Sequence, residues 1–380
     1  MRILHTSDWH LGKRLFKLDR SPEHAHFLNW LINTIIERKI DLLLVAGDIF
    51  DTPTPPHQSL EMFYNFLHRL SEETKTQTLI IAGNHDSGLL LEAPSKLLNS
   101  HRVKVWGKLS QDPKDHWVKI ESNGETIELC AIPFFRSYEL LPNGEGSALE
   151  VLQKYLLRER TAPQILMLHH LAGVFEESGT EQLITLSGVD SIPTELIKQF
   201  DYVALGHIHK AQKIAGNTYY SGSPLPMRFS ETHEKSVREI LITGEKVEID
   251  KIVIPLARDL HVIKANQTNW KDKLDAIESN SPLIAMVEVQ LTLEAPIVGI
   301  VSDIKDCISQ KGMELLSYMP IYTGMEKREA RHEKLFELSP LDVFKEFYKF
   351  KYPNASEIPE ELKDDFKDLI QKVKNAPNQT

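Results

Sequence analysis

Two short motifs place metal-binding side chains two residues apart: Asp8 with His10, and His207 with His209. Alternate residues of an extended segment point to the same side, so each motif can direct both of its side chains at one point. Imidazole and carboxylate groups without a thiolate suit divalent ions such as Mn, Fe or Zn better than soft metals. Each motif could therefore hold part of a divalent metal site.

The chain offers more donors of this kind than one ion can use. The candidates are Asp8, His10, Asp48, Asn84, one histidine of the His169-His170 pair, His207 and His209. Together with waters, this set suits two ions that share a bridging carboxylate, which we expect to be Asp48; paired metals are a common device for phosphoryl displacement. A single histidine after a strand, such as His5, is more often structural. Burying the whole set at one sheet edge without a metal would be costly.

Five apolar runs must position these donors, and a donor follows each: residues 3–7, 42–47, 78–83, 165–168 and 202–206. Short apolar runs bounded by polar or turn residues predict buried strands. Ligands of open α/β sheets bind at the carboxyl ends of the strands, so we expect the donors to meet there. Around Asn123-Gly124 the sequence predicts a β-hairpin, within a second and more antiparallel half of a sandwich.

The order of the motifs resembles that of the calcineurin-like metallophosphoesterase superfamily: Asp-x-His at 8–10, Gly-Asp-x-x-Asp at 47–51, Gly-Asn-His-Asp at 83–86, a histidine after the strand 165–168, and Gly-His-x-His at 206–209. Residues 5–12, 45–51, 204–212 and 221–224 further resemble the DNA double-strand-break-repair nuclease branch, in particular the bacterial SbcD family. The resemblance implies an α/β fold: a four-layer metallophosphoesterase β-sandwich flanked by helices, with a small α+β capping domain and a C-terminal helical extension.

The resemblance also implies roles for single residues. The seven donors become ligands of two divalent ions, most often Mn²⁺. The first polar position after the strand is usually the ligand, which favours His169, and His170 stays open as the alternative. His85 is expected to protonate the leaving oxygen, and the carboxylate of Asp51 to orient the His85 imidazole. A turn-forming role is the alternative for Asp51.

The implied activity is that of a metal-dependent DNA nuclease, a 3′-to-5′ double-strand exonuclease and single-strand or hairpin endonuclease in DNA repair, recombination and replication. The chain has no Gly-x-x-x-x-Gly-Lys-Ser/Thr loop, so ATP hydrolysis must come from a partner, which the resemblance identifies as the coiled-coil SbcC ATPase. Family resemblance also implies a homodimer through the early helices; the apolar stripe of the helix from about His57 fits the protein core as the alternative. A small-molecule phosphodiesterase and a non-catalytic scaffold of the same fold are the alternatives.

Composition bounds the rest of the prediction. A chain of 380 residues, 41% of them hydrophobic, can bury a large core, and we expect a nuclease domain over 1–257, a capping domain over 258–325 and an ATPase-binding helical extension over 326–380. A net charge of −10 argues against a generic nucleic-acid binder, so metals, a partner or a local basic loop must meet the phosphates. Lys13, Arg14 and Lys17 with Phe16 could form that loop.

Cys130 and Cys307 are expected to be buried and reduced. No membrane span or leader is evident, and we expect a cytoplasmic protein.

Overall fold

The computed structural model describes residues 1–141, 143, 145–177, 179 and 191–323, together with 344, 347, 348, 358–360, 362–364 and 366. It divides into two compact units. The first comprises Met1–Leu291 and Gly299–Met319, and the second Thr292–Val298 and Pro320–Thr380. Most of the expected helical extension over 326–380 lies outside the described residues.

The first large sheet is mostly parallel and begins with the N-terminal strand. Its order is β14 (Lys246–Val253), β13 (Ser236–Thr243), β1 (Arg2–Thr6), β4 (Leu42–Ala46), β5 (Gln77–Ile81) and β6 (Val103–Trp106). The strands β1, β4, β5 and β6 run parallel, and β13 and β14 close one edge antiparallel. The carboxyl ends of β1, β4 and β5 therefore lie at one edge, where the sequence predicted donors.

The second large sheet is also mostly parallel, so the expectation of a more antiparallel half was wrong. Its order is β11 (Gln212–Ala215), β12 (Thr218–Tyr220), β10 (Tyr202–Gly206), β9 (Gln164–His169), β8 (Glu125–Ile132) and β7 (Trp117–Ser122). The pairs β8–β9, β9–β10 and β10–β12 are parallel. Helical crossovers through α6 (Ala148–Leu156) and α7 (Thr194–Ile197) return the chain in the same direction for the pairs β8–β9 and β9–β10. The hairpin at Asn123-Gly124 is confirmed.

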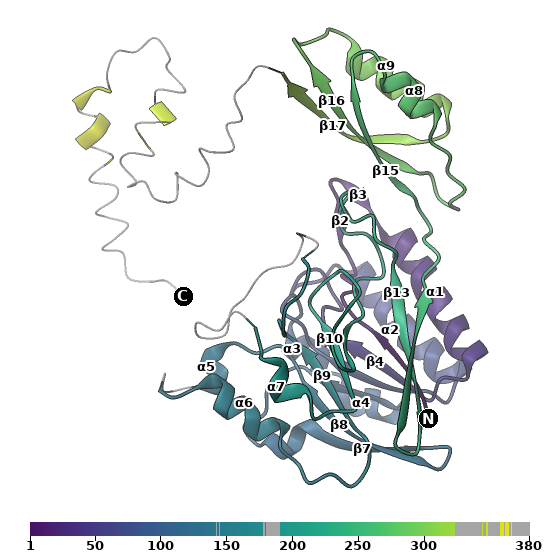
Figure 1. Cartoon of the computed structure of the whole chain (residues 1–380), viewed down its shortest axis with the longest axis vertical. Coiled ribbons are helices and arrows are strands. Elements are labelled where there is room, and N and C mark those ends of the chain that lie inside the picture. The colour runs from purple at the N-terminus through teal and green to yellow at the C-terminus, as the bar shows by residue number, and fades with distance from the viewer. Residues whose placement is uncertain are drawn as a thin grey trace. The chain divides into compact units, whose positions relative to one another are not determined.

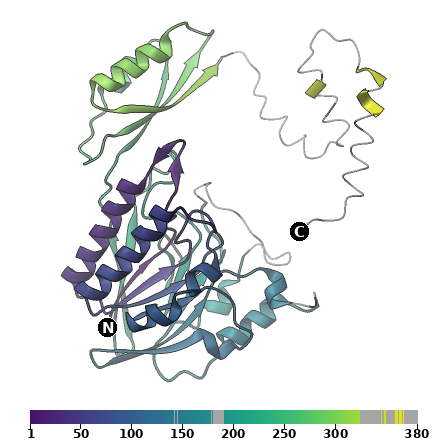
Figure 2. The same ribbon diagram turned by 180° about the vertical axis from the view of Figure 1, so that it is seen from behind.

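Four layers build the larger domain, as expected. Along β4, Leu42, Leu44 and Ala46 face the second sheet, whereas Leu43 and Val45 face helices. Helices α1 (Ser21–Arg38) and α2 (His57–Glu73) cover the outer face of the first sheet, and α6 and α7 cover that of the second (Figures 1 and 2). Burial on both faces explains why these strands are continuously apolar. The shorter helices are α3 (Gly88–Glu92), α4 (Ser95–Ser100), α5 (Ser137–Leu140) and the 3₁₀ turn Pro113–His116.

A smaller α+β arrangement follows the sandwich. It has a three-stranded sheet in the order β15 (Leu260–Asn266), β16 (Met286–Leu293) and β17 (Glu314–Tyr322), with helices α8 (Trp270–Asp275) and α9 (Ile300–Gln310). The alternation of strand and helix matches the expected order. Cys130 is buried and Cys307 only partly so, and both are free thiols, so the expected burial of Cys307 was wrong. Among the described helices, none combines the length and apolar character that a membrane span requires.

Candidate metal centre

The carboxyl ends of five strands meet where the two sheets pack together. In the first sheet, the backbone N–H of Asp8 donates to the carbonyl of Gly47 (3.0 Å), and that of His10 to the carbonyl of Asp48 (3.0 Å). In the second sheet, Gly206 of β10 pairs in register with His169 of β9. These contacts align the segments that follow β1, β4, β9 and β10, so residues distant in sequence face a common point.

Four residues of this edge adopt left-handed backbone conformations: Asp8 (φ +53°), His10 (+48°), Asp48 (+52°) and His207 (+100°). A positive φ is uncommon for residues other than glycine and costs about 1–3 kcal/mol, so it persists only where the surroundings enforce it. All four belong to the predicted donor set. The strand ends are therefore bent sharply at the positions that present the donors.

The first cluster of donors combines both sheets. Single ligand atoms of Asp8, His10 and His209 all lie within 4.8 Å of one another, and all three residues are buried. The two Nε2 atoms of His10 and His209 are 3.1 Å apart. The carboxylate of Asp8 accepts the backbone N–H of His207 (2.9 Å) and the hydroxyl of Ser7. We name Asp8, His10 and His209 the first donor group.

Asp48, His169 and His207 form the second donor group, by the same distance criterion. The amide oxygen of Asn84 joins it, 2.8 Å from His207 Nδ1 and 3.1 Å from His169 Nε2. Asp48 lies between the two groups, since its Oδ1 is 3.5 Å from His169 Nε2 and its Oδ2 is 3.5 Å from His10 Nε2. The structure thus brings all seven sequence-predicted donors together, with Asp48 in the central position.

The donor set fits divalent metal ions. Two facing imidazole nitrogens at 3.1 Å, beside buried carboxylates, need a shared cation or proton between them. Burial alone would raise the pKa of Asp48, but the His169 and His10 imidazoles hold that pKa below its ordinary range. Burial disfavours the charged form of His169, but Asp48 outweighs it and raises the pKa of His169 to about 9. Positive charge is therefore favoured beside Asp48 in the second donor group.

The two adjacent histidines of the 169–170 pair face different surroundings. His169 contacts Asn84 and Asp48, and its Nδ1 donates to the carbonyl of Ala46 (2.7 Å). His170 points away and accepts the backbone N–H of Phe135 through Nε2 (3.2 Å), with its ring stacked on Phe134. Burial holds the pKa of His170 well below its ordinary value. The alternation of a strand separates the two side chains, so only His169 reaches the donors.

Asp51 contacts His85, but not through the atom that we expected. His85 Nδ1 is 2.8 Å from the backbone carbonyl of Asp51, to which it donates. The Asp51 carboxylate instead contacts Lys13 Nζ (2.9 Å) and lies 3.5 Å from His10 Nδ1. Burial would raise the pKa of Asp51, but His10 and Lys13 lower it to about 2. The expected orientation of His85 by Asp51 therefore runs through the backbone carbonyl, and the carboxylate makes its closest contact with Lys13.

The basic loop that the sequence singled out forms a small hairpin next to this edge. The strands β2 (Arg14–Leu15) and β3 (Leu18–Asp19) pair with each other, with Phe16 in the turn at φ +53°. The Phe16 side chain is 59% exposed. Through Lys13 the hairpin contacts Asp51, so a positive and aromatic surface adjoins the donors.

Sequence reasoning included Asp86 in its central motif but gave this carboxylate no role. Its two oxygens accept the backbone N–H groups of Gly83 (2.8 Å), Phe50 (2.9 Å) and Ile49 (3.1 Å). Burial and the nearby charge of Asp48 raise the pKa of Asp86 to about 6. Asp86 thereby ties the loops after β4 and β5 together. An acidic residue closing a Gly-Asn-His-Asp turn was the available signal.

Two more residues, which no sequence pattern selected, lie behind His209. Glu231 Oε1 is 3.9 Å from His209 Nδ1, and Glu231 is paired with Lys235 at 2.6 Å. No motif marks either residue, because their contact with His209 depends on how the segment after β12 folds back.

Comparisons with known proteins agree with this geometry. A family model described as calcineurin-like phosphoesterase matches residues 1–211, and one described as type 5 capsule protein repressor C-terminal domain matches residues 257–352. The SbcD subunit of the nuclease SbcCD from Escherichia coli (strain K12) is 29% identical over 378 residues, which cover 90% of this chain and 92% of that protein. Its namesake from Bacillus subtilis (strain 168) is 34% identical over 285 residues, covering 70% and 72%.

A dimetal phosphatase from Danio rerio, of known structure, is 12% identical with a TM-score of 0.39, covering 67% of this chain and 99% of that one. The assignment depends on the family model and the curated relatives instead. The phosphoesterase model spans more than half of the 380 residues, and the Bacillus subtilis protein is matched over 72% of its length. On these grounds the chain belongs to the SbcD family of calcineurin-like phosphoesterases.

Proposed function

We propose that this chain is a metal-dependent DNA nuclease, with 3′-to-5′ exonuclease activity on duplexes and endonuclease activity on single strands and hairpins. The observation that carries the proposal is the pair of donor groups that share Asp48 as their neighbour. Two adjacent sites with a common carboxylate suit hydrolysis of a phosphodiester. The relatives named as parts of the SbcCD nuclease support DNA as the substrate.

The donors would hold two ions, and resemblance to the family favours Mn²⁺. Asp8, His10 and His209 would hold one ion, and His169, His207 and Asn84 the other, with Asp48 between them. When bound, the ions would activate a water for attack on the phosphorus and neutralise the phosphate oxygens.

His85 is proposed as the general acid for the leaving oxygen. The carbonyl of Asp51 accepts a hydrogen bond from its Nδ1, which leaves Nε2 to exchange the proton. The backbone N–H of His85 also donates to Asp48 Oδ1 (2.9 Å), so the proton donor is fixed relative to the central carboxylate. Asp51 is proposed to act as a positioning residue, by its carbonyl toward His85 and by its carboxylate toward His10.

DNA would reach this centre along the β2–β3 hairpin. Lys13, Arg14 and Lys17 supply positive charge in a chain whose net charge is −10, and the exposed Phe16 ring offers a face for a base. Phosphate contacts of this kind position the substrate without reading its sequence.

We propose residues 1–257 as the nuclease domain, 258–325 as a capping domain and 326–380 as the segment that binds a coiled-coil SbcC-like ATPase. The second family model, over residues 257–352, supports a separate C-terminal part. The complex would act in repair, recombination and replication of DNA, in the cytoplasm.

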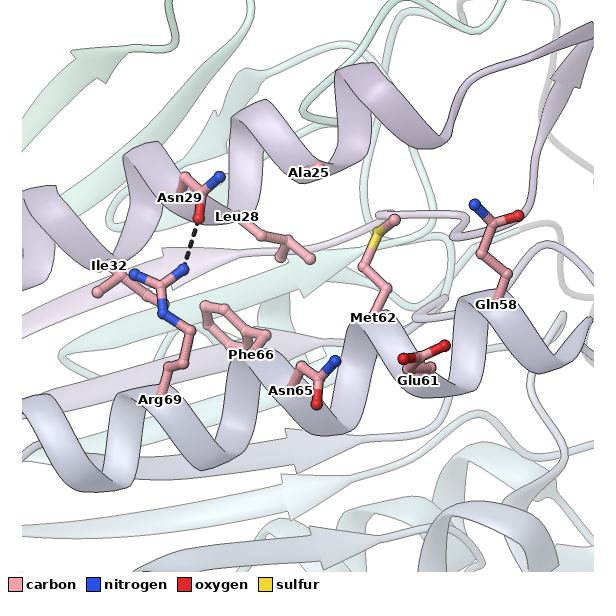
Figure 3. A pocket seen from close by; sticks show the side chains of 10 residues that line it. All are labelled: Ala25, Leu28, Asn29, Ile32, Gln58, Glu61, Met62, Asn65, Phe66 and Arg69. Carbon is pink, nitrogen blue, oxygen red and sulfur yellow. Dashed lines mark hydrogen bonds between the residues drawn. The ribbon is translucent and has the colours of Figure 1, made fainter.

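A homodimer is proposed through the outer face of α1 and α2. Figure 3 shows a groove between the two helices, with Arg69 of α2 reaching Asn29 of α1 across it (2.5 Å). Its volume is about 280 Å³, and apolar side chains such as Leu28, Met62 and Phe66 line it. We expect the full chain to be a dimer by light scattering and Met62→Glu to shift it toward monomer, because a buried charge opposes association. A wild-type monomer at micromolar concentration would contradict this interface.

The function is tested with an end-labelled duplex and, in parallel, bis(p-nitrophenyl) phosphate. We expect the purified chain to degrade the duplex with Mn²⁺ and to lose that activity with a chelator. Cleavage of the small diester without cleavage of DNA, even with an SbcC-like ATPase added, would favour a small-molecule phosphodiesterase. Lack of any Mn²⁺ binding would favour the non-catalytic scaffold.

A further inference from the structure

A buried ion pair lies outside the seven donors and contacts one of them. Glu231 and Lys235 are 5% and 2% exposed, and Lys235 Nζ is 2.6 Å from Glu231 Oε2. The other carboxylate oxygen, Oε1, faces His209 Nδ1 at 3.9 Å. His209 Nε2 faces His10 in the first donor group, so Glu231 lies next to the other nitrogen of the same ring.

Lys235 contacts the main chain of the same histidine. Its Nζ donates to Ser223 Oγ (2.9 Å) and to the carbonyl oxygen of His209 (3.4 Å), and it lies 3.0 Å from His233 Nε2. The backbone N–H of Ser223 also donates to the His209 carbonyl (3.1 Å). The Glu231–Lys235 ion pair thus lies against both the backbone and the ring of His209.

One imidazole of the second donor group, that of His169, is supported differently. His169 Nδ1 donates to a neutral backbone carbonyl, that of Ala46. A carboxylate behind an imidazole makes the ring a more basic ligand and fixes its orientation, which a carbonyl does more weakly. Burying a charged pair costs several kcal/mol per ion, so stability alone is a weak reason for such a pair.

We propose that Glu231 and Lys235 are positioning residues of the first donor group, which orient His209 so that this group binds its divalent ion more tightly than the second group does. The inference rests on the proposed function, since it presupposes that both groups bind metal. Beyond that function, the inference predicts that the two sites differ in metal affinity and that Glu231 and Lys235 cause the difference.

The test is titration of the full-length chain with Mn²⁺, followed by electron paramagnetic resonance of the free ion, which gives the number of sites and their dissociation constants. Glu231→Gln removes the carboxylate charge with little change in shape. We expect this variant to weaken the tighter class of sites about 10–100-fold and to leave the weaker class unchanged. A general loss of structure would move both classes, so the selective loss separates positioning from folding.

Glu23→Gln is the matched control. Glu23 is also buried and is paired with two arginines, Arg20 and Arg258, each at 3.0 Å, but it belongs to neither donor group. We expect it to bind Mn²⁺ within twofold of the wild type. Glu231→Asp, which keeps the charge but withdraws it by one methylene, gives the same comparison if Glu231→Gln fails to fold; the tighter class should again weaken selectively.

Three results would overturn the inference: a folded Glu231 variant with wild-type affinities, equal weakening of both classes, or an equal effect of Glu23→Gln. If the wild type binds Mn²⁺ and one of these three results is obtained, the inference fails but the proposed nuclease function is unaffected. Failure of the wild type to bind Mn²⁺ would instead overturn both proposals.

Discussion

The two sheets of the sandwich contribute different chemistry to the candidate centre. The first sheet supplies every oxygen donor, Asp8, Asp48 and Asn84, together with His10 and His85. The second sheet supplies only imidazoles, from His169, His207 and His209. The carboxylates among the donors therefore come from one sheet alone, and the other sheet adds only imidazoles to each donor group.

Neither sheet can build a donor group alone. The first group takes Asp8 and His10 from the first sheet and His209 from the second, and the second group takes Asp48 from the first sheet. The centre thus forms only when the sheets pack face to face. Metal binding should in turn stabilise that packing, because a ligand that binds only the folded state shifts the folding equilibrium.

The largest effect is expected at the central oxygen of the first sheet. Asp48→Asn removes the charge next to both donor groups, so both sites should weaken. When catalytic residues act as a unit, removing one can cost about as much activity as removing all of them, so we expect DNA cleavage to fall by more than about 10⁴-fold. Mn²⁺ titration and cleavage of an end-labelled duplex would measure the two losses.

Asp41 provides the control for this change, since it precedes the same strand that Asp48 follows. Asp41 accepts the backbone N–H of Arg2 (2.7 Å) at the opposite end of β4. Asp41→Asn should retain cleavage within about threefold. Wild-type metal binding by Asp48→Asn would contradict the central role of this oxygen.

A smaller effect, with a different signature, is expected at His85 of the first sheet. His85→Ala removes the proposed proton donor but none of the proposed ligands, so cleavage should fall about 10²–10⁴-fold while Mn²⁺ affinity stays unchanged. The exposed His57 at the start of α2 is the control, and His57→Ala should behave as the wild type. Loss of metal together with activity in His85→Ala would make His85 a ligand instead.

In the second sheet, the adjacent histidines give a matched pair. His169→Asn should weaken metal binding and reduce cleavage by about 100-fold or more, since even residues that only orient a ligand contribute 10–100-fold. His170→Asn should keep metal affinity but lose about 1–3 kcal/mol of stability, because the Phe135 N–H loses its buried acceptor. Thermal unfolding and Mn²⁺ titration distinguish the two, and the reverse pattern would assign the ligand to His170.

The sequence was sufficient to predict the strands and the donors that follow them, because both signals are local. An apolar run that ends at Asp48 or Asn84 is visible without knowledge of the sheet order. The direction of the strands in the second sheet could not be predicted from the sequence, since it depends on whether the connections are hairpins or helical crossovers. Glu231 and Lys235 could not be predicted for a related reason: only the three-dimensional path of the chain brings them behind His209.

The smallest expected effect probes the contact between the sheets. A Cβ at Gly206 of β10 would lie 1.8 Å from the carbonyl oxygen of Ala46 in β4, the same oxygen that holds His169 Nδ1. Gly206→Ala must therefore separate the strands slightly, which should cost about 1–3 kcal/mol of stability and also displace His169.

Gly216 lies in the turn between β11 and β12, where an added Cβ has no atom within 4 Å, although its φ of +51° disfavours alanine. Gly216→Ala should cost about 1–2 kcal/mol of stability through backbone strain alone and leave Mn²⁺ affinity intact. Gly206→Ala should lower both quantities, because the contact that it disturbs belongs to the sheet packing and to the metal centre at once. Equal Mn²⁺ affinity in the two variants would mean that the second sheet can shift without moving its imidazoles, and that the centre depends on the first sheet far more than on the packing between them.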